Sequence, residues 1–167
     1  MTSGKMKWTQ HKLRQTGYPL VEWLFVAKQA GKSFGILRDG SWVIETADGL
    51  AGLQDNALIF AYPLLNTTKM DIHEGITVAT HGITELSVAT FPMKEVIIHA
   101  IKRGGYWAQR AFEWLPELDL EISEIKMLVS AIESIENNKQ GTTQNLRHQA
   151  RKQRILLTSR LTNMTPE

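Results

Sequence analysis

The pattern of apolar residues changes at Pro92, and this boundary sets the class of fold that the 167-residue chain can adopt. Before Pro92, short runs of branched and aromatic residues are separated by turn-forming residues, which is typical of strands. After Pro92, apolar residues recur at the spacing of amphipathic helices. We therefore predict an α+β fold, in which an N-terminal helix and short antiparallel strands precede a helical C-terminal half of three to four helices.

The N-terminal helix is expected from Tyr18 to Ala30. Pro19 suits the first turn of a helix, and Gly31 suits the position just after its end. Because the apolar residues between them cover most of the helix circumference, we expect this helix to be buried. Residues 1–16 precede it and contain Lys and Arg but no acid, which predicts a basic N-terminal arm.

The pair Asp39-Gly40 lies between two β-prone runs, residues 33–38 and 41–46, and is the strongest hairpin signal in the chain. We predict an antiparallel hairpin at this point. Two further alternating runs, residues 76–80 and 86–91, predict two more strands. Residues 55–66 fit either a buried strand or a helix, since the periodicity of so short an apolar run is compatible with both.

Four helices are predicted after Pro92. They span residues 94–103, 106–115, 122–135 and 143–161. Gly104 is expected to cap the first helix and Pro116 to end the second, although the glycine pair Gly104-Gly105 could instead only weaken one longer helix. Because the connecting loops are short, the helices should pack as antiparallel neighbours.

Length and composition suit one globular domain over residues 17–167, strand-rich from 33 to 92 and helical from 93 to 162. Apolar residues make up 43% of the chain and charged residues 22%, as in ordinary globular proteins. The absence of cysteine excludes disulfides, zinc-thiolate sites and thiol nucleophiles. The longest apolar stretch, residues 57–65, is about half the length of a membrane-spanning helix. We expect a protein of the cytoplasm.

Positive charge is concentrated at both ends of the chain. Residues 1–16 and 137–166 contain basic residues and no acid, whereas the stretch between them holds 16 of the 17 carboxylates. Charges separated in this way either pair within the molecule or attract a partner of opposite charge. Arg147, Arg151 and Arg154 share one face of the last predicted helix. Packed beside the acidic helices before it, they would form ion pairs worth about 0.2–1 kcal/mol each.

The leading hypothesis is a non-enzymatic protein-binding module. It would act as an immunity protein, antitoxin or inhibitor that neutralises a toxin or enzyme by stoichiometric binding. The sequence has no catalytic or cofactor motif, and separated charges with surplus aromatic residues could build an interface. The candidate acidic face for a basic toxin or nuclease consists of Glu113, Glu117, Asp119, Glu121 and Glu124.

Trp107 and Trp114 are candidate aromatic anchors for a partner. A core position is the favoured alternative for both, because large aromatic side chains are highly buried on average. The order of Tyr106-Trp107, Trp114-Leu115, acidic residues and a basic last helix is similar to that of small bacterial immunity proteins, without a specific motif in common. This resemblance implies a small helical protein that binds another protein.

The alternative function is a nucleic-acid-binding regulator of phage or plasmid type. Its contacts to nucleic acid would come from the basic last helix, through Arg147, Arg151, Lys152 and Arg154. The negative charge of the central stretch argues against this function, since it would repel the phosphates of a duplex.

An enzyme would need a pocket that gathers His73, His81 or His99 with carboxylates. The cluster of possible metal ligands matches no zinc motif, and we predict neither a metal site nor a cofactor. This cluster consists of Asp71, His73, Glu74, His81 and Glu85.

Overall fold

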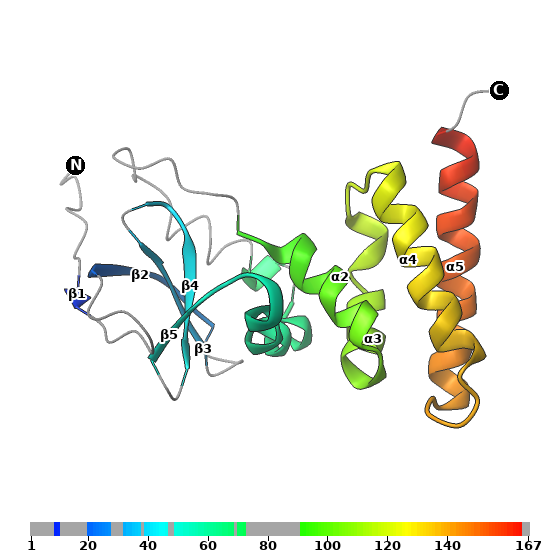
Figure 1. Cartoon of the computed structure of the whole chain (residues 1–167), viewed down its shortest axis with the longest axis horizontal. Helices are drawn as coiled ribbons and strands as arrows, with labels where there is room; N and C mark the ends of the chain where they lie inside the picture. The colour runs from blue at the N-terminus through cyan, green and yellow to red at the C-terminus, as the bar shows by residue number, and fades with distance from the viewer. Residues whose placement is uncertain are drawn as a thin grey trace. The chain divides into compact units, whose positions relative to one another are not determined.

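The computed structural model describes residues 9–10, 20–27, 32–37, 39–46, 49–68, 70–72 and 91–164 (Figure 1). The chain divides into two compact units, Met1–Met93 and Lys94–Glu167. The described strands lie in the first unit and the long helices in the second, so the fold class is α+β. The division of residues 1–167 into a basic arm and one globular domain stays a prediction.

The strands described in the first unit form one antiparallel sheet (Figure 1). Each strand pairs with the next one in the sequence. On neighbouring strands, Phe34 lies opposite Ile44 and Ile36 lies opposite Trp42, and all four side chains are buried. Phe91 packs edge-to-face on Phe34 and Trp42, with ring centroids 5.4 and 5.0 Å apart. The strands are β1 (Thr9–Gln10), β2 (Leu20–Ala27), β3 (Lys32–Leu37), β4 (Trp42–Thr46) and β5 (Gly49–Gly52).

The hairpin predicted at Asp39-Gly40 is confirmed as the connection between β3 and β4. Gly40 has a φ of 87°, which glycine adopts at little cost. The backbone N–H of Leu37 donates to the carbonyl of Ser41 at 3.0 Å. The Asp39 carboxylate accepts hydrogen bonds from the hydroxyl and the backbone N–H of Ser41, which lower the pKa of Asp39. This turn fixes the register of the hairpin.

The helix predicted from Tyr18 to Ala30 is not confirmed, because residues 20–27 form strand β2. β2 pairs antiparallel with β3, with a bulge between Trp23 and Phe25. Its sequence consists mainly of Leu, Val, Phe and Trp, and branched and aromatic side chains favour strands. Pro19 is equally compatible with the start of a strand, where no ladder hydrogen bond is lost.

Residues 55–66, which fit either a strand or a helix, form a 3₁₀ helix, η2 (Asp55–Asn66). Pro63 lies inside η2, and Leu58, Ala61, Tyr62, Leu64 and Leu65 are buried. The strands predicted at 76–80 and 86–91 lie outside the described residues, apart from Phe91.

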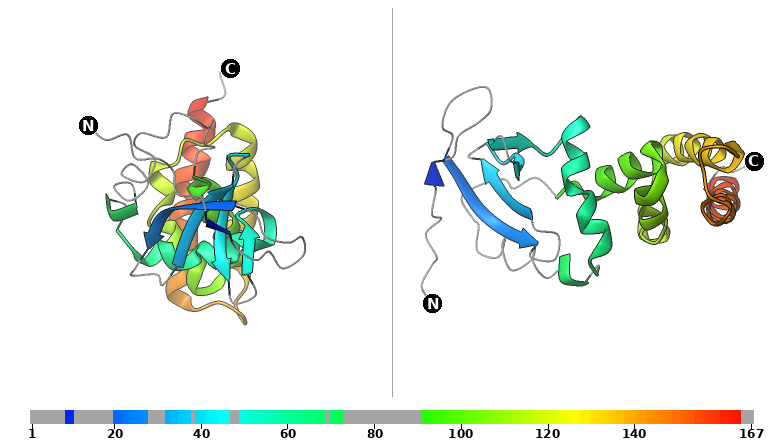
Figure 2. Two further views of the ribbon diagram at one scale, coloured as in Figure 1. Left: turned by 90° about the vertical axis from the view of Figure 1, so that its left-hand side faces the viewer. Right: turned by 90° about the horizontal axis from the view of Figure 1, so that it is seen from below.

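The second unit contains the four helices that the sequence predicts, with ends shifted by a few residues. They are α2 (Met93–Arg103), α3 (Gly105–Phe112), α4 (Ile122–Asn137) and α5 (Gln144–Met164), with a short 3₁₀ turn, η3 (Leu115–Glu117). Figures 1 and 2 show α4 and α5 running side by side in opposite directions. The core of this pair is formed by buried side chains of both helices, among them Leu128, Ile132, Ala150 and Leu157.

The break between α2 and α3 depends on Gly104, which has φ 74° and ψ −165°. Its N–H donates to the carbonyls of Ala100 and Ile101 at 3.2 and 3.1 Å and so ends α2. Gly105 also has a positive φ, of 66°. The glycine pair therefore separates two helices, and the alternative of one longer helix is wrong.

We expect Gly104→Ala to lower the free energy of unfolding by about 1–3 kcal/mol, because an L residue is strained at this backbone conformation. The loss comes from the backbone alone, since a Cβ on Gly104 would meet nothing within 4 Å. Urea unfolding followed by circular dichroism measures it. Gly52→Ala is the control: the added Cβ comes no closer than 3.9 Å to its neighbours. Equal losses in both variants would contradict this explanation.

Candidate functional site

The predicted acidic face lies between the end of α3 and the first turn of α4. We call residues 113–121 the acidic segment. Four of its side chains, Glu113, Glu117, Asp119 and Glu121, are exposed. Glu113 forms an ion pair with Arg110, with 2.7 Å between Oε1 and Nη1. The fifth predicted residue, Glu124, is half-buried and lies just beyond the segment.

The backbone of the acidic segment is fixed by cations from two helices. Arg160 of α5 donates from Nη2 to the carbonyl of Leu118 at 3.0 Å. Lys94 of α2 donates from Nζ to the carbonyl of Asp119 at 3.5 Å. Because these cations bind the backbone, they fix the position of the segment without covering its exposed carboxylates.

Glu124 has a structural role at the start of α4. Its carboxylate accepts a hydrogen bond from the backbone N–H of Glu121 at 2.9 Å, as part of a capping box. The Oε1 atom of Glu124 also forms an ion pair with Nζ of Lys94 at 2.9 Å. The hydrogen bond from Lys94 lowers the pKa of Glu124 and raises that of Lys94. The Glu121 carboxylate accepts from the backbone N–H of Glu124 in the same capping box. Of the five predicted acidic residues, Glu124 is the one that is half-buried.

The two candidate aromatic anchors differ in exposure. Trp114 is only 8% exposed and belongs to the core, so a partner cannot reach it in this structure. Trp107 is half-buried. It packs edge-to-face on Tyr106, which is 58% exposed, with ring centroids 4.9 Å apart. Sequence reasoning missed Tyr106 as an exposed aromatic side chain, although its place directly after the Gly104-Gly105 break puts it in the first turn of α3.

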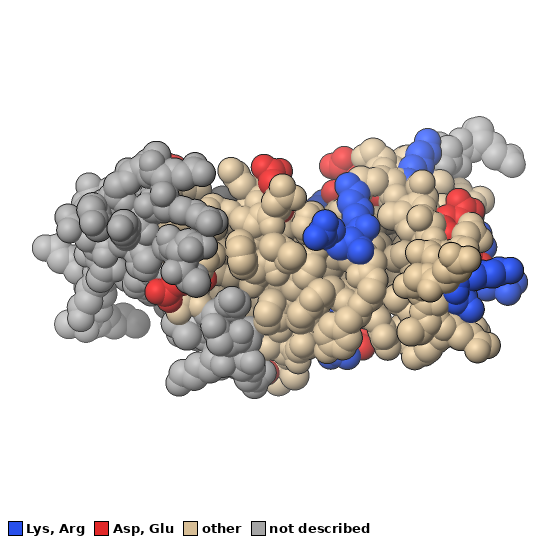
Figure 3. All heavy atoms as spheres, turned by 60° about the horizontal axis from the view of Figure 1, so that its bottom comes forward, with Lys and Arg blue, Asp and Glu red and all other residues tan. Residues whose placement is uncertain are grey.

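The basic residues of α5 are partly used inside the helical unit. Arg154 donates from Nε to Oε2 of Glu136 at 2.8 Å, and Arg151 lies 3.9 Å from the other oxygen of this carboxylate. Arg147 donates from Nη1 to the carbonyl of Thr142 at 2.6 Å. Within the described part of the chain, no hydrogen bond or ion pair engages the fourth predicted contact, Lys152, which is exposed. On the face of the helical unit seen in Figure 3, basic and acidic side chains are interspersed among uncharged ones.

The hydrogen bond from Arg154 lowers the pKa of Glu136. A carboxylate with a lowered pKa in the folded state stabilises the fold above its unfolded pKa, and this contribution is lost as the pH falls through the folded value. We therefore expect Glu136→Gln to lower the urea midpoint at neutral pH. The gap to the wild type should close in strong acid.

Urea midpoints measured from neutral pH down into the acid range test this expectation. Glu133→Gln, an exposed position on the same helix, is the matched control. A gap between Glu136→Gln and the wild type that stays constant over the whole range would contradict it.

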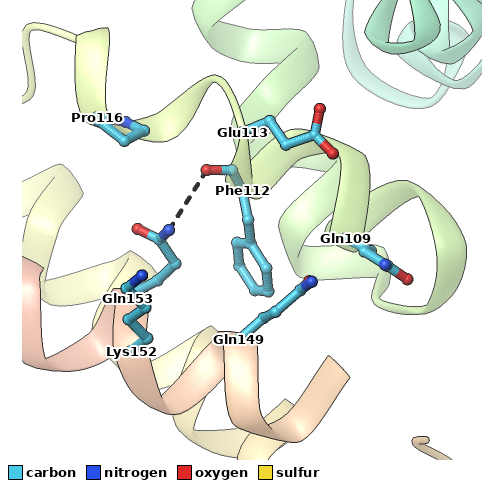
Figure 4. Close-up of a pocket in the computed structure, with 7 residues that line it drawn as sticks. All are labelled: Gln109, Phe112, Glu113, Pro116, Gln149, Lys152 and Gln153. Atoms are coloured by element: carbon cyan, nitrogen blue, oxygen red, sulfur yellow. Dashed lines mark hydrogen bonds between the residues drawn. The ribbon is translucent and has the colours of Figure 1, made fainter. Parts of the chain in front are cut away.

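A groove runs along the helical unit between α3, η3 and α5 (Figure 4). We call it the α5 groove. Its larger part has a volume of about 280 Å³ and is lined by Gln109, Phe112, Glu113, Pro116, Gln149, Lys152 and Gln153. Gln153 donates from Nε2 to the carbonyl of Phe112 at 3.5 Å (Figure 4).

The smaller part of the α5 groove, about 140 Å³, shares Pro116 and Gln153 with the larger one. Leu115, Leu156, Leu157 and Arg160 complete its lining. Sequence reasoning missed this groove. The available signal was the pair Gln149 and Gln153, four residues apart on the last helix and therefore on one side of it.

Of the histidines that an enzyme would gather, His73 and His81 lie outside the described residues, and His99 is half-buried on α2. Four of the five possible metal ligands of the sequence also lie outside, and the fifth, Asp71, is exposed. Among the side chains that the structure describes, no group of three or more His, Asp and Glu residues could hold a metal ion.

No protein-family model matches the chain, and neither does any curated protein or solved structure. None of the described helices combines the length and the apolar character that crossing a membrane requires. The function therefore has to be inferred from the chemistry of the described surfaces.

Proposed function

We propose that this protein is a non-enzymatic binding module that neutralises a basic protein, such as a toxin or nuclease, by stoichiometric association. The observation that carries the proposal is the acidic segment, which presents four exposed carboxylates on a backbone fixed by Arg160 and Lys94. A surface that is already ordered loses little conformational freedom on binding. Opposite potentials also speed the encounter and disfavour wrong partners.

Two further observations support a protein partner over nucleic acid. Arg147 and Arg154, two of the four candidate phosphate contacts, bind groups of their own unit. The exposed Tyr106 beside Trp107 offers aromatic surface of the kind that anchors protein interfaces. An encounter in the cytoplasm is compatible with a chain that contains no cysteine.

Affinity capture with a charge-reversed variant tests the proposal. The immobilised wild type should retain a basic protein from an extract of the source cells, in an equimolar complex that native mass spectrometry detects. Glu117→Lys combined with Asp119→Lys should weaken this complex roughly 100-fold, because two attractive contacts become repulsive.

The matched control is Glu95→Lys combined with Glu133→Lys, which changes the net charge equally at exposed positions of α2 and α4. This control should retain the partner. Equal losses in both variants would show that only the total charge matters. Capture of nucleic acid in place of a basic protein would contradict the proposal outright.

A further inference from the structure

We propose that the α5 groove is a second docking site, and that it binds an acidic peptide segment of a partner protein through one large apolar side chain. The site is built entirely from the helical unit. It shares Glu113, Leu115 and Pro116 with the acidic segment, but its cations, Lys152 and Arg160, come from α5. The proposal does not rest on the proposed function, because it is argued from the groove and from these cations.

The smaller part of the groove provides the apolar contact. Leu115 and Leu157 are buried at this hollow, whereas Leu156 on its rim is 47% exposed. The exposed Pro116 adds further apolar surface. A volume of about 140 Å³ holds several water molecules. Displacing them with an apolar side chain removes apolar surface from water on both partners.

The larger part of the groove provides hydrogen-bonding groups for a peptide backbone. Three amide side chains line it, those of Gln109, Gln149 and Gln153 (Figure 4). The Oε1 atom of Gln149 is buried and has no hydrogen-bond partner among the described residues. A buried acceptor without a partner is costly. If the Gln149 side chain turns this oxygen into the groove, a backbone N–H of a bound peptide would satisfy it.

The charges around the groove select an acidic occupant. Lys152 lines the larger part and Arg160 the smaller part. The single carboxylate of the lining, on Glu113, already pairs with Arg110 at 2.7 Å. Helix α5 itself contains no acidic residue. The carboxylates of an acidic peptide would therefore meet Lys152, which has no ion-pair partner among the described residues.

A peptide is a better fit than nucleic acid, because Leu115, Leu156 and Leu157 have no counterpart to contact on a phosphate backbone. The groove thus combines an apolar pocket, amide groups and flanking cations. This combination matches a short segment in which a Leu or Phe is flanked by Asp and Glu.

Fluorescence anisotropy with two labelled probes tests the proposal on the full-length protein. The first probe is a synthetic acidic peptide of Asp and Glu that contains two leucines, and the second has serine in place of both leucines. The leucine peptide should bind at least roughly tenfold more tightly, as expected for burying one large aliphatic side chain.

Substitutions locate the binding site. Leu156→Ser and Lys152→Glu should each weaken binding of the leucine peptide roughly tenfold or more. The matched controls are Ile155→Ser, at a neighbouring exposed position outside the groove lining, and Lys126→Glu, at an exposed position of α4. Both controls should bind like the wild type. The side-chain amide signals of Gln149 should shift in NMR spectra when the leucine peptide is added.

Several results would overturn the proposal. The leucine peptide could fail to bind at millimolar concentration, or the serine peptide could bind equally well. Leu156→Ser and Ile155→Ser could also lower the affinity for the leucine peptide by the same factor. If duplex DNA displaces the peptide, and if Leu156→Ser weakens the binding of that duplex, the occupant of the groove would be nucleic acid. If the protein forms a dimer that Leu156→Ser dissociates, the occupant would be a second copy of the chain. The variant Glu117→Lys with Asp119→Lys should still bind the peptide, so the two proposals can fail separately.

Discussion

Phe91→Ala should lower the free energy of unfolding of the first unit by about 3–5 kcal/mol. Phe91 is buried and joins β3 to β4 through edge-to-face contacts with Phe34 and Trp42. Each aromatic pair contributes about 0.5–1.5 kcal/mol beyond the burial of its area. Removing Phe91 deletes two such pairs and leaves a cavity beside the sheet.

Urea unfolding followed by near-UV circular dichroism measures this loss, because Trp42 changes its environment when the cluster opens. Phe60→Ala is the matched control, since Phe60 is an exposed phenylalanine of the same unit. The control should lose far less stability. A similar loss in both variants would mean that the cluster of Phe34, Trp42 and Phe91 is not the core of this unit.

Ile132→Ala should destabilise the helical unit by about 2–5 kcal/mol. Ile132 is fully buried on α4, the helix that packs along α5. Alanine removes three carbon atoms from a close-packed interior, which loses both the burial of those atoms and their dispersion contacts. Arg160, which holds the acidic segment through the carbonyl of Leu118, lies on α5. Looser packing of α4 against α5 should therefore also weaken this hydrogen bond.

Far-UV circular dichroism during urea unfolding reports on Ile132→Ala, since this unit contains the long helices. Ser130→Ala changes an exposed position of the same helix and should leave the urea midpoint almost unchanged. If Ile132→Ala were as mild as Ser130→Ala, the packing of α4 on α5 described above would be wrong.

The elements that the sequence predicted correctly are those with local signals. The Asp39-Gly40 turn needs only two residues to specify its backbone, and it is confirmed with Gly40 at positive φ. Helix α4 is equally local. Its apolar residues Ile125, Leu128, Ile132 and Ile135 recur at helical spacing, and all four are buried.

Strand β2 could not be predicted in the same way, because its partner is the neighbouring strand β3 and not its own sequence. Residues 20–27 form an almost unbroken apolar run, and such a run fits a buried helix as well as a strand. Pro19 and Gly31 suit both structures. The 3₁₀ helix η2 shows the same ambiguity, because residues 55–66 fit either a strand or a helix, and Pro63 lies inside it.

The sequence allowed single residues of the candidate site to be predicted, but not the surface that they form together. Exposure of Glu117 and Asp119 follows from their charge. The hydrogen bonds that fix this segment come from Lys94 and Arg160, which are distant in the sequence. The α5 groove likewise exists only because the chain brings Phe112 next to Gln153, and no local pattern encodes that contact.

Calorimetric titration of the captured basic protein, with duplex DNA titrated in parallel at about 0.15 M salt, tests the central claim most directly. We predict equimolar binding of the protein to the wild type, binding roughly 100-fold weaker to Glu117→Lys with Asp119→Lys, and no heat from the duplex. Equal affinity of wild type and variant for the protein, together with duplex binding that Arg151→Glu with Lys152→Glu abolishes, would contradict the claim.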